Sequence, residues 1–301
     1  MNKMKKCWLV TFVVAFGFFA QGALAQERNQ EFPRDVHGLW WQPADPGWAT
    51  TVFDHETAMS SALLLYDHEG RPIWFFSPRL DCARETPRDI LVGCFGAMYR
   101  VTGPWFGEPT FRPDLVRAEA VGEWSGGWAA PLFGGVGPDS RRTLYILYTI
   151  NGTTIRMGGG TPMLVQVIDR DAPLLYLDTS HSGLWGNPNE RGWGVGLFQQ
   201  GNKLTATLFI HGRDGQPRWY VVNATAPEFF DVTVGPPFNR LFEGEVFETR
   251  GHPWGVVTTE QYSARRVGSA SLRYGATAAD GASLRYSIDG VEVSKTIFRL
   301  R

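Results

Sequence analysis

The sequence predicts an all-β protein that consists of two homologous, antiparallel, up-and-down β-barrel-like domains of about eight strands each. Three observations lead to this prediction. A pattern occurs twice, short apolar segments alternate with turn signals, and tryptophan and glycine are abundant, at 12 and 35 of 301 residues. Two β-sandwiches are the alternative architecture.

The repeated pattern keeps a constant offset of 145 residues between its two copies and has no gap. Three of the matched positions are tryptophans. Because each copy continues well beyond the matched core, it is a unit of domain size rather than a solenoid repeat. We expect domain 1 at residues 36–168, a linker at 169–181 and domain 2 at 182–301. The matched positions are Gly38, Leu39, Trp40, Pro43, Gly47, Trp48, Phe53, Leu63, Gly70, Pro72 and Trp74 in the first copy, and Gly183, Leu184, Trp185, Pro188, Gly192, Trp193, Phe198, Leu208, Gly215, Pro217 and Trp219 in the second.

Local signals predict strands joined by tight turns. Residues 203–210 are rich in apolar and β-branched side chains, which favours a strand. Asp214-Gly215 predicts a hairpin after it, and Asn151-Gly152 and Asp289-Gly290 predict equivalent late hairpins in the two copies. Alternate residues of 192–197 are glycine, which indicates sharp coiling or the close approach of another group.

The N-terminus is typical of a secretory signal peptide at residues 1–25. Three lysines precede an apolar run, and Ala23-Leu24-Ala25 matches a cleavage site. The alternative is a membrane anchor, but the run of about 14 residues is shorter than the ~20 that a spanning helix needs. We therefore expect cleavage after Ala25, a leader at 26–35, and a periplasmic or secreted protein that does not span a membrane.

Cysteine usage agrees with export. Cys7 belongs to the predicted signal peptide, which leaves Cys82 and Cys94 as an even pair. The alternative, a redox or metal pair, does not fit their spacing, because no C-x-x-C motif is present. We predict a structural disulfide between them.

The composition and motifs favour a protein without catalytic activity. A net charge of -1 gives no general attraction to nucleic acid. The chain has no paired-histidine metal motif, no nucleophile elbow and no phosphate-binding loop. We therefore predict no metal, no cofactor and no catalytic residue. A grouping of His37, Asp45 and His55 in the fold would favour an enzyme.

Tryptophan dominates the candidate binding residues. The indoles of Trp48, Trp74, Trp193 and Trp219 are predicted to line a cavity or to form stacking platforms, although core packing is the alternative. Trp41 is expected to point outward, because its neighbour Trp40 takes the other face of the strand. Asp45 and Glu190 occupy equivalent turns, where each carboxylate either binds a ligand hydroxyl or caps the turn. The five tryptophans that the repeat does not explain are candidates for an exposed surface: Trp41, Trp105, Trp124, Trp128 and Trp254.

Two resemblances accompany this interpretation. The Gly-x-Trp at Trp40 and at Trp185 resembles the opening of the first strand in lipocalin-like and avidin-like barrels. That resemblance implies a structural tryptophan that closes one end of each barrel, against a basic residue such as Arg299 or Arg301. The longer pattern, G-L-W-x-N-P-x-E-x-G-W-G followed by G-x-P-x-W-Y-V, resembles a tandem repeat of proteins exported by proteobacteria, whose function is not established. It implies no chemistry.

The sequence thus predicts an exported, non-catalytic binding protein whose partner is a small molecule or a glycan. The alternative is a structural or protein-interaction module of the cell envelope with a protein partner. A hydrolase is the least favoured class, because the sequence offers no convergent set of titratable groups.

Overall fold

The computed structural model describes residues 38–42, 45–55, 59–83, 91–129, 143–157, 164–166, 181–200, 203–226, 241–253, 262–275 and 281–300. The predicted signal peptide, the predicted leader and nearly all of the predicted linker lie outside these ranges, as do His37, Trp254 and Arg301. Within them, no helix is long and apolar enough to cross a membrane.

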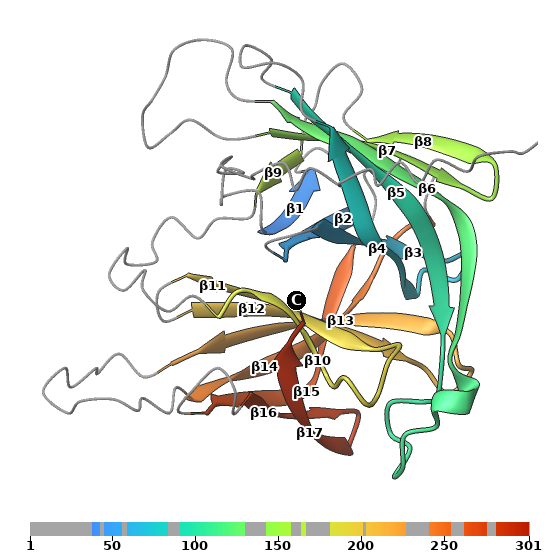
Figure 1. Cartoon of the computed structure of the whole chain (residues 1–301). Coiled ribbons are helices and arrows are strands. Elements are labelled where there is room, and N and C mark those ends of the chain that lie inside the picture. The colour runs from blue at the N-terminus through green and yellow to red at the C-terminus, as the bar shows by residue number, and fades with distance from the viewer. Residues whose placement is uncertain are drawn as a thin grey trace, which may run out of the picture. The chain divides into compact units, whose positions relative to one another are not determined.

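The first repeat forms a curled, antiparallel sheet of nine strands (Figure 1). Neighbouring strands pair in chain order from β1 to β8, and β9 pairs with both β1 and β7. A short 3-10 turn, η2 (Pro113–Leu115), lies between β5 and β6. The strands are β1 (Gly38–Gln42), β2 (Asp45–Asp54), β3 (Met59–Tyr66), β4 (Pro72–Ala83), β5 (Leu91–Thr102), β6 (Arg117–Ala129), β7 (Thr143–Ile150), β8 (Thr153–Met157) and β9 (Leu164–Gln166).

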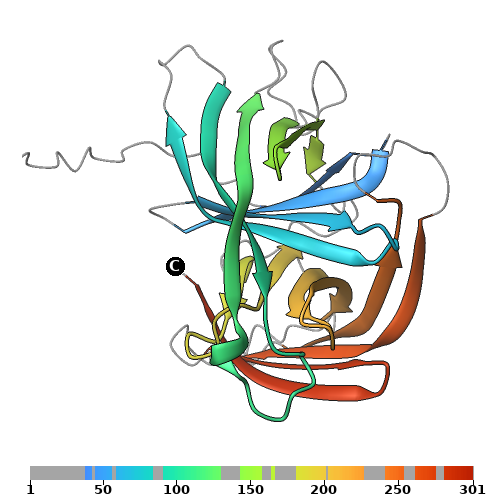
Figure 2. The same ribbon diagram turned by 90° about the vertical axis from the view of Figure 1, so that its right-hand side faces the viewer.

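The second repeat forms a closed antiparallel barrel of eight strands, drawn from yellow to red in Figures 1 and 2. The last strand closes the barrel onto the first, where Trp185 and Gly186 pair with Arg299 and Phe298. The two sheets confirm the predicted all-β, up-and-down fold class. The strands are β10 (Gly183–Gly186), β11 (Gly194–Gln200), β12 (Lys203–His211), β13 (Pro217–Thr225), β14 (Leu241–Arg250), β15 (Ser263–Tyr274), β16 (Ala282–Ile288) and β17 (Val291–Arg299).

The predicted hairpins are confirmed by their backbone conformation. Asn151 and Gly152 have φ values of 50° and 76° between β7 and β8, and Asp289 and Gly290 have 45° and 81° between β16 and β17. Positive φ at two successive residues is the requirement of the tight hairpin turn that Asn-Gly and Asp-Gly favour. Gly215 ends the turn between β12 and β13 with φ 71°.

Strand register shows that the sequence repeat is also a structural repeat. Thr50 pairs with Leu63 in the first sheet, and the matched residues Val195 and Leu208 pair in the second. Further along, Ser61 pairs with Ser77 as Ala206 pairs with Val222. Directly opposed residues of an antiparallel pair share a face. Matched residues therefore face the same side of their sheets.

Each sheet encloses a core of its own. Trp40, predicted to be structural, is fully buried in the first repeat and is one of the largest fully buried side chains among the described residues. Its counterpart Trp185 is 5% exposed, belongs to the core of the second barrel and donates its indole N–H to the carbonyl of His181 at 2.9 Å. The core of that barrel is otherwise aliphatic and aromatic. Its described members include Val195, Leu197, Leu204, Ala206, Leu208, Val222, Phe242, Val246, Ala270, Leu272, Leu284, Tyr286 and Ile297.

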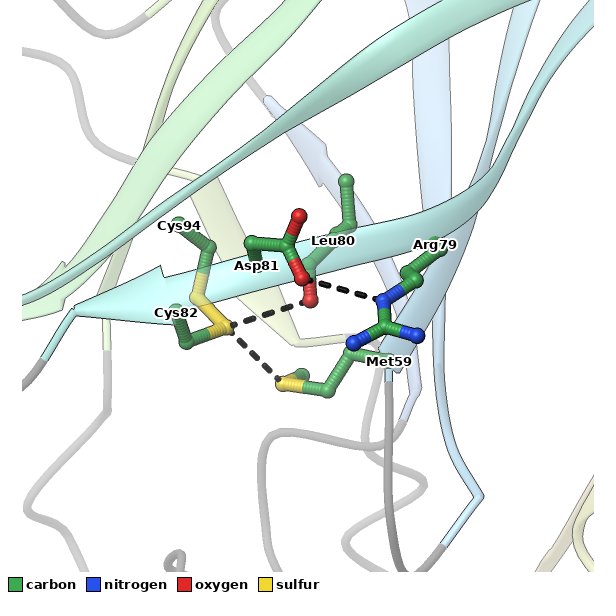
Figure 3. The surroundings of a disulfide bond; sticks show 6 residues. All are labelled: Met59, Arg79, Leu80, Asp81, Cys82 and Cys94. Carbon is green, nitrogen blue, oxygen red and sulfur yellow. Dashed lines mark hydrogen bonds and ion pairs between the residues drawn. A yellow bond between two sulfur atoms is a disulfide. The ribbon is translucent and has the colours of Figure 1, made fainter. Parts of the chain in front are cut away.

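The predicted cysteine pair is at bonding distance (Figure 3). Cys82 in β4 and Cys94 in β5 are direct cross-strand neighbours, and their sulfur atoms lie 2.00 Å apart. The register of β4 and β5 shifts between Phe76 and Asp81, just before this pair. The bond therefore holds the two strands together beyond the irregularity. Sγ of Cys82 also lies 3.7 Å from Sδ of Met59 on β3.

We expect removal of this bond to destabilise the protein. A disulfide that closes so short a loop contributes about 3 kcal/mol in the chain-entropy model. Cys82→Ser together with Cys94→Ser should lower the free energy of unfolding by about that amount, measured by urea denaturation. Ser294→Ala, on the exposed face of β17, is the control and should leave it nearly unchanged. Equal urea midpoints for oxidised and reduced wild-type protein would contradict the structural role.

Candidate functional site

Two of the predicted binding tryptophans hold the two repeats together. Trp74 donates its indole N–H to the carbonyl of Ile210, at 3.2 Å. Trp219, its counterpart, donates to the carbonyl of Leu65, at 3.0 Å. Leu65 and Ile210 are themselves matched positions, so the two hydrogen bonds are reciprocal. Both indoles are nearly fully buried, at 3% and 6% exposure, and contact the opposite repeat.

Further contacts between the two repeats also join matched residues in a reciprocal way. Phe53 stacks on its own counterpart Phe198, with ring centroids 5.7 Å apart and planes 17° from parallel. Trp219 lies against Tyr66 at 5.5 Å, and Trp74 lies against the matched His211 at 5.8 Å. The contact between the repeats is therefore nearly two-fold symmetric, with the two phenylalanines at the axis.

Two glycines make this approach possible. The main-chain N–H of Gly103, after β5, donates to the carbonyl of Gly215, and that of Gly251, after β14, donates to the carbonyl of Gly70. A Cβ at Gly103 would lie 2.8 Å from the imidazole of His211, and one at Gly251 would lie 2.5 Å from the ring of Tyr66. The predicted close approach at the glycine-rich strand β11 is also found, because a Cβ at Gly196 would lie 2.7 Å from Phe53.

Glu190 and Trp193 meet at one mouth of the second barrel. Trp193 donates its indole N–H to a carboxylate oxygen of Glu190 at 3.2 Å, and Lys295 forms an ion pair with the same oxygen at 2.7 Å. The main-chain N–H of Glu190 also donates to the carbonyl of Asn187, as in a turn. The carboxylate thus joins the first turn of the repeat to its last strand, β17.

This mouth is filled by the first repeat. Phe106 lies in the connection between β5 and β6, which is green in Figure 2. The centroid of its ring is 6.5 Å from that of Tyr220 and 6.2 Å from that of Tyr286. The main-chain N–H of Phe106 donates to the carbonyl of His211 at 3.1 Å. Beside Phe106 and Trp193 lies a cavity of about 20 Å³, which is room for one water molecule.

His211 is a neutral, buried group at this contact. It is 2% exposed, and its Nε2 has no hydrogen-bond partner among the described residues. The pKa of His211 is lowered to about 4, mainly by burial and also by the positive charge of Arg218, against the opposing effect of a backbone hydrogen bond at Val101. The imidazole therefore carries no charge at neutral pH.

The interior of the first repeat contains a group of buried polar side chains, which we call the polar cluster, and most of its members are replaced by apolar side chains in the second repeat. Thr50 donates to the carbonyl of Ala62 at 3.0 Å, and its Oγ1 lies 2.9 Å from Oγ of Ser61. The members of the polar cluster are Thr50, Ser61, Ser77, Trp124 and Tyr148, each buried to at least 99%.

Three members of the polar cluster carry unsatisfied groups. Within the described part of the chain, Oγ of Ser77, Nε1 of Trp124 and the hydroxyl of Tyr148 have no hydrogen-bond partner. Burial raises the pKa of Tyr148; the side chains of Thr50 and Trp124 oppose this rise, although neither makes a hydrogen bond of regular geometry with the hydroxyl. Native proteins pair nearly all buried polar groups, so such groups are uncommon; the described part of the second repeat contains others, on Thr207 and His211.

The register locates these groups on the inner face. Trp124 pairs with Tyr148 on one side and with Gly96 on the other, so the indole lies over a residue without a side chain. Ser61 and Ser77 form a second cross-strand pair. The matched positions of the second barrel hold Val195, Ala206, Val222, Ala270 and Tyr286.

The other predicted candidates lie apart from the polar cluster. Trp48 is buried at 6% exposure, whereas Trp41 is exposed at 37%, as expected from its place in β1. Asp45 belongs to β2, but its side chain lies outside the described residues. Trp124, which we expected on an exposed surface, is instead fully buried. The hydroxyl-bearing members were not predicted; the signal that reveals them is the substitution of valine or alanine by serine or threonine at matched inner positions.

Of His37, Asp45 and His55, whose grouping would favour an enzyme, only His55 has a described side chain. No group of three or more His, Cys, Asp or Glu side chains among them is arranged to hold a metal ion. His55 lies between the carbonyl of Leu300, at 3.0 Å from Nδ1, and Oγ of Ser60, at 2.6 Å from Nε2. Ser60 is 1% exposed, whereas His55 is only partly buried.

Comparison with known proteins gives no relative: no family model, no curated protein and no solved structure matches the chain.

We expect Trp74→Phe and Trp219→Phe to destabilise the protein equally. Each removes one indole N–H and leaves a buried carbonyl short of a donor, which costs about 1–3 kcal/mol. Urea denaturation should show the two losses to be similar, because the two contacts are equivalent. Trp193→Phe is the matched control and should cost less, because Glu190 remains solvated and paired with Lys295. Clearly unequal losses for Trp74 and Trp219 would contradict the symmetry.

The buried imidazole of His211 predicts acid sensitivity. Its pKa is about 4 in the folded protein against 6.5 for the ordinary group. Between these values the unfolded chain binds a proton that the folded chain does not, so stability falls as the pH decreases from 6.5 towards 4 and is unaffected above 6.5. The loss over that interval reaches about 3 kcal/mol. Denaturation curves of His211→Phe at several pH values should lack this component; an unchanged pH profile would refute the assignment.

Proposed function

We propose that the protein is a non-catalytic binding protein that holds a small, neutral molecule inside the first repeat. The observation that carries this proposal is the set of three buried polar groups, on Ser77, Trp124 and Tyr148, that have no hydrogen-bond partner among the described residues. Leaving a buried donor or acceptor unpaired costs about 1–3 kcal/mol each. A bound molecule that pairs with all three groups removes this cost.

The chemistry of the polar cluster restricts the ligand. The indole of Trp124 only donates a hydrogen bond, so the ligand must offer an acceptor oxygen, whereas Ser77 and Tyr148 can donate or accept. Among the described residues, Arg218 of the second repeat is the only Asp, Glu, Lys or Arg side chain that is buried. An ionised ligand would therefore lose its hydration without a compensating charge. A carbonyl or hydroxyl compound with an apolar body fits this interior best.

The second repeat supports the proposal by contrast. Four of its five matched inner positions are apolar, the fifth being Tyr286, and Phe106 of the first repeat occupies one mouth of its barrel. The predicted export of the chain and the disulfide between Cys82 and Cys94 suit a protein that meets its ligand outside the cytoplasm. One barrel therefore binds, and the other serves as its partner in folding.

The test is thermal unfolding in the presence of cyclohexanone, caprolactam and γ-decalactone, three probes that each join a carbonyl oxygen to an apolar body. We expect at least one to raise the unfolding midpoint in a saturable way, because a ligand that binds only the folded state adds about 2.7 kcal/mol at a hundred times its Kd. Thr50→Val with Ser77→Val installs the type of side chain found in the second repeat. This variant should unfold at a higher temperature without probe and lose the response to the probes.

Ser294→Val, on the exposed outer face of β17, is the matched control and should respond as the wild type does. If native mass spectrometry finds no retained small molecule and none of the three probes shifts the unfolding midpoint, ordered water alone pairs with the three polar groups and the proposal is wrong. The site is elsewhere if the double variant responds as strongly as the wild type.

A further inference from the structure

We infer that each repeat carries a self-complementary face, so that the same face of a second copy of this chain is a partner that fits it. This face consists, in the second repeat, of Phe198, Phe209, His211 and Trp219 and, in the first, of the matched Phe53, Leu64, Tyr66 and Trp74.

The reciprocity of the contacts supports this inference. In an interface between identical partners, residue i touches j while j touches i, and a residue on the axis touches its own copy. The indole of Trp74 reaches Ile210 while that of Trp219 reaches Leu65. Phe53 stacks on the matched Phe198, as a residue on a two-fold axis does. The repeats meet as the subunits of a homodimer meet.

The chemistry of the contact tolerates differences between the repeats. Its four hydrogen bonds from indole and glycine N–H groups all end on main-chain carbonyls. A main-chain acceptor is present whatever the side chain at that position. The remainder of the face is aromatic and aliphatic, and the exchange of Tyr66 for His211 keeps a flat ring against the partner's indole. The second repeats of two different chains can therefore form the same contact that the first and second repeats form within one chain.

In the intact chain the two faces cover each other. Tethering of the two repeats in one chain gives an effective concentration in the millimolar range, which exceeds the concentration of other chains in solution. Pairing between chains therefore becomes visible only when one face is disabled. The face that is then uncovered contains an apolar surface together with unsatisfied indole and carbonyl groups, which favour association with a matching face.

The main experiment disables the first face in the chain from Gln26, the predicted mature N-terminus. Phe53→Arg with Trp74→Arg places two charges in the contact, and this chain contains no cysteine besides Cys82 and Cys94. We expect sedimentation velocity to show a dimer whose fraction rises with protein concentration from 1 to 100 μM (on the order of the weak-to-moderate affinities of standard interfaces). Adding Phe198→Cys, on the axis, should give disulfide-linked dimers on non-reducing gels.

Matched variants test whether the dimer forms through the proposed face. Ser294→Cys, far from the face in sequence and exposed on β17, should give no comparable cross-link. The mirror variant, Phe198→Arg with Trp219→Arg, uncovers the first face and should cross-link through Phe53→Cys instead. Monomers at every concentration in both variants, or cross-linking at Ser294 as strong as at Phe198, would overturn the inference.

A second experiment keeps both faces covered and does not depend on a destabilised variant. Tyr66→His with His211→Tyr exchanges the two rings across the axis. If the faces are equivalent, the exchanged chain should unfold within about 4 °C of the wild type, and the acid-sensitive step should persist because position 66 now buries the imidazole. Loss of cooperative unfolding in the exchanged chain would show that the faces are not equivalent and would overturn the inference.

Discussion

The architecture depends on two buried indole N–H groups that must find acceptors. Trp74 and Trp219 each satisfy this need on a carbonyl of the opposite repeat, so neither repeat completes its own hydrogen bonding alone. The close approach that these bonds require explains why a glycine faces the ring of His211 and another faces that of Tyr66. It also assigns two tryptophans that suit a ligand platform to the contact between the repeats. Tryptophan suits ligand binding, but these two tryptophans instead join the two repeats.

Because the two repeats share one framework, their differences are informative. Matched positions have the same register, so a polar side chain in one repeat and an apolar one in the other cannot be attributed to different places in the sheet. The pairs Thr50 and Val195, and Ser77 and Val222, are such differences. An apolar side chain suits this position in the second repeat, yet in the first repeat Ser77 holds a buried hydroxyl without a hydrogen-bond partner among the described residues. This difference between the repeats is the basis of the proposed ligand site.

The fold was largely predictable, and the polar cluster was not. Asn151-Gly152 and Asp289-Gly290 predict hairpins from the local sequence alone, because few residues tolerate two successive positive φ values. Trp124 carries no such local signal. Its burial depends on closure of the sheet and on Gly96 as its cross-strand neighbour, which are properties of register rather than of composition. Glu190 was correctly placed at a turn, but its bond to Lys295 joins residues 105 positions apart.

The sequence by itself determined the all-β class, the duplication, the turns and the pairing of Cys82 with Cys94. These features rest on local backbone preferences and on comparison of the chain with itself. The tertiary structure alone decided which of the matched tryptophans face a core, which face the other repeat and which remain exposed. It also decided that Phe106 of the first repeat enters the second barrel. The reason is physical: strand periodicity assigns a side chain to one of two faces, and only the packing of the sheets determines what each face meets.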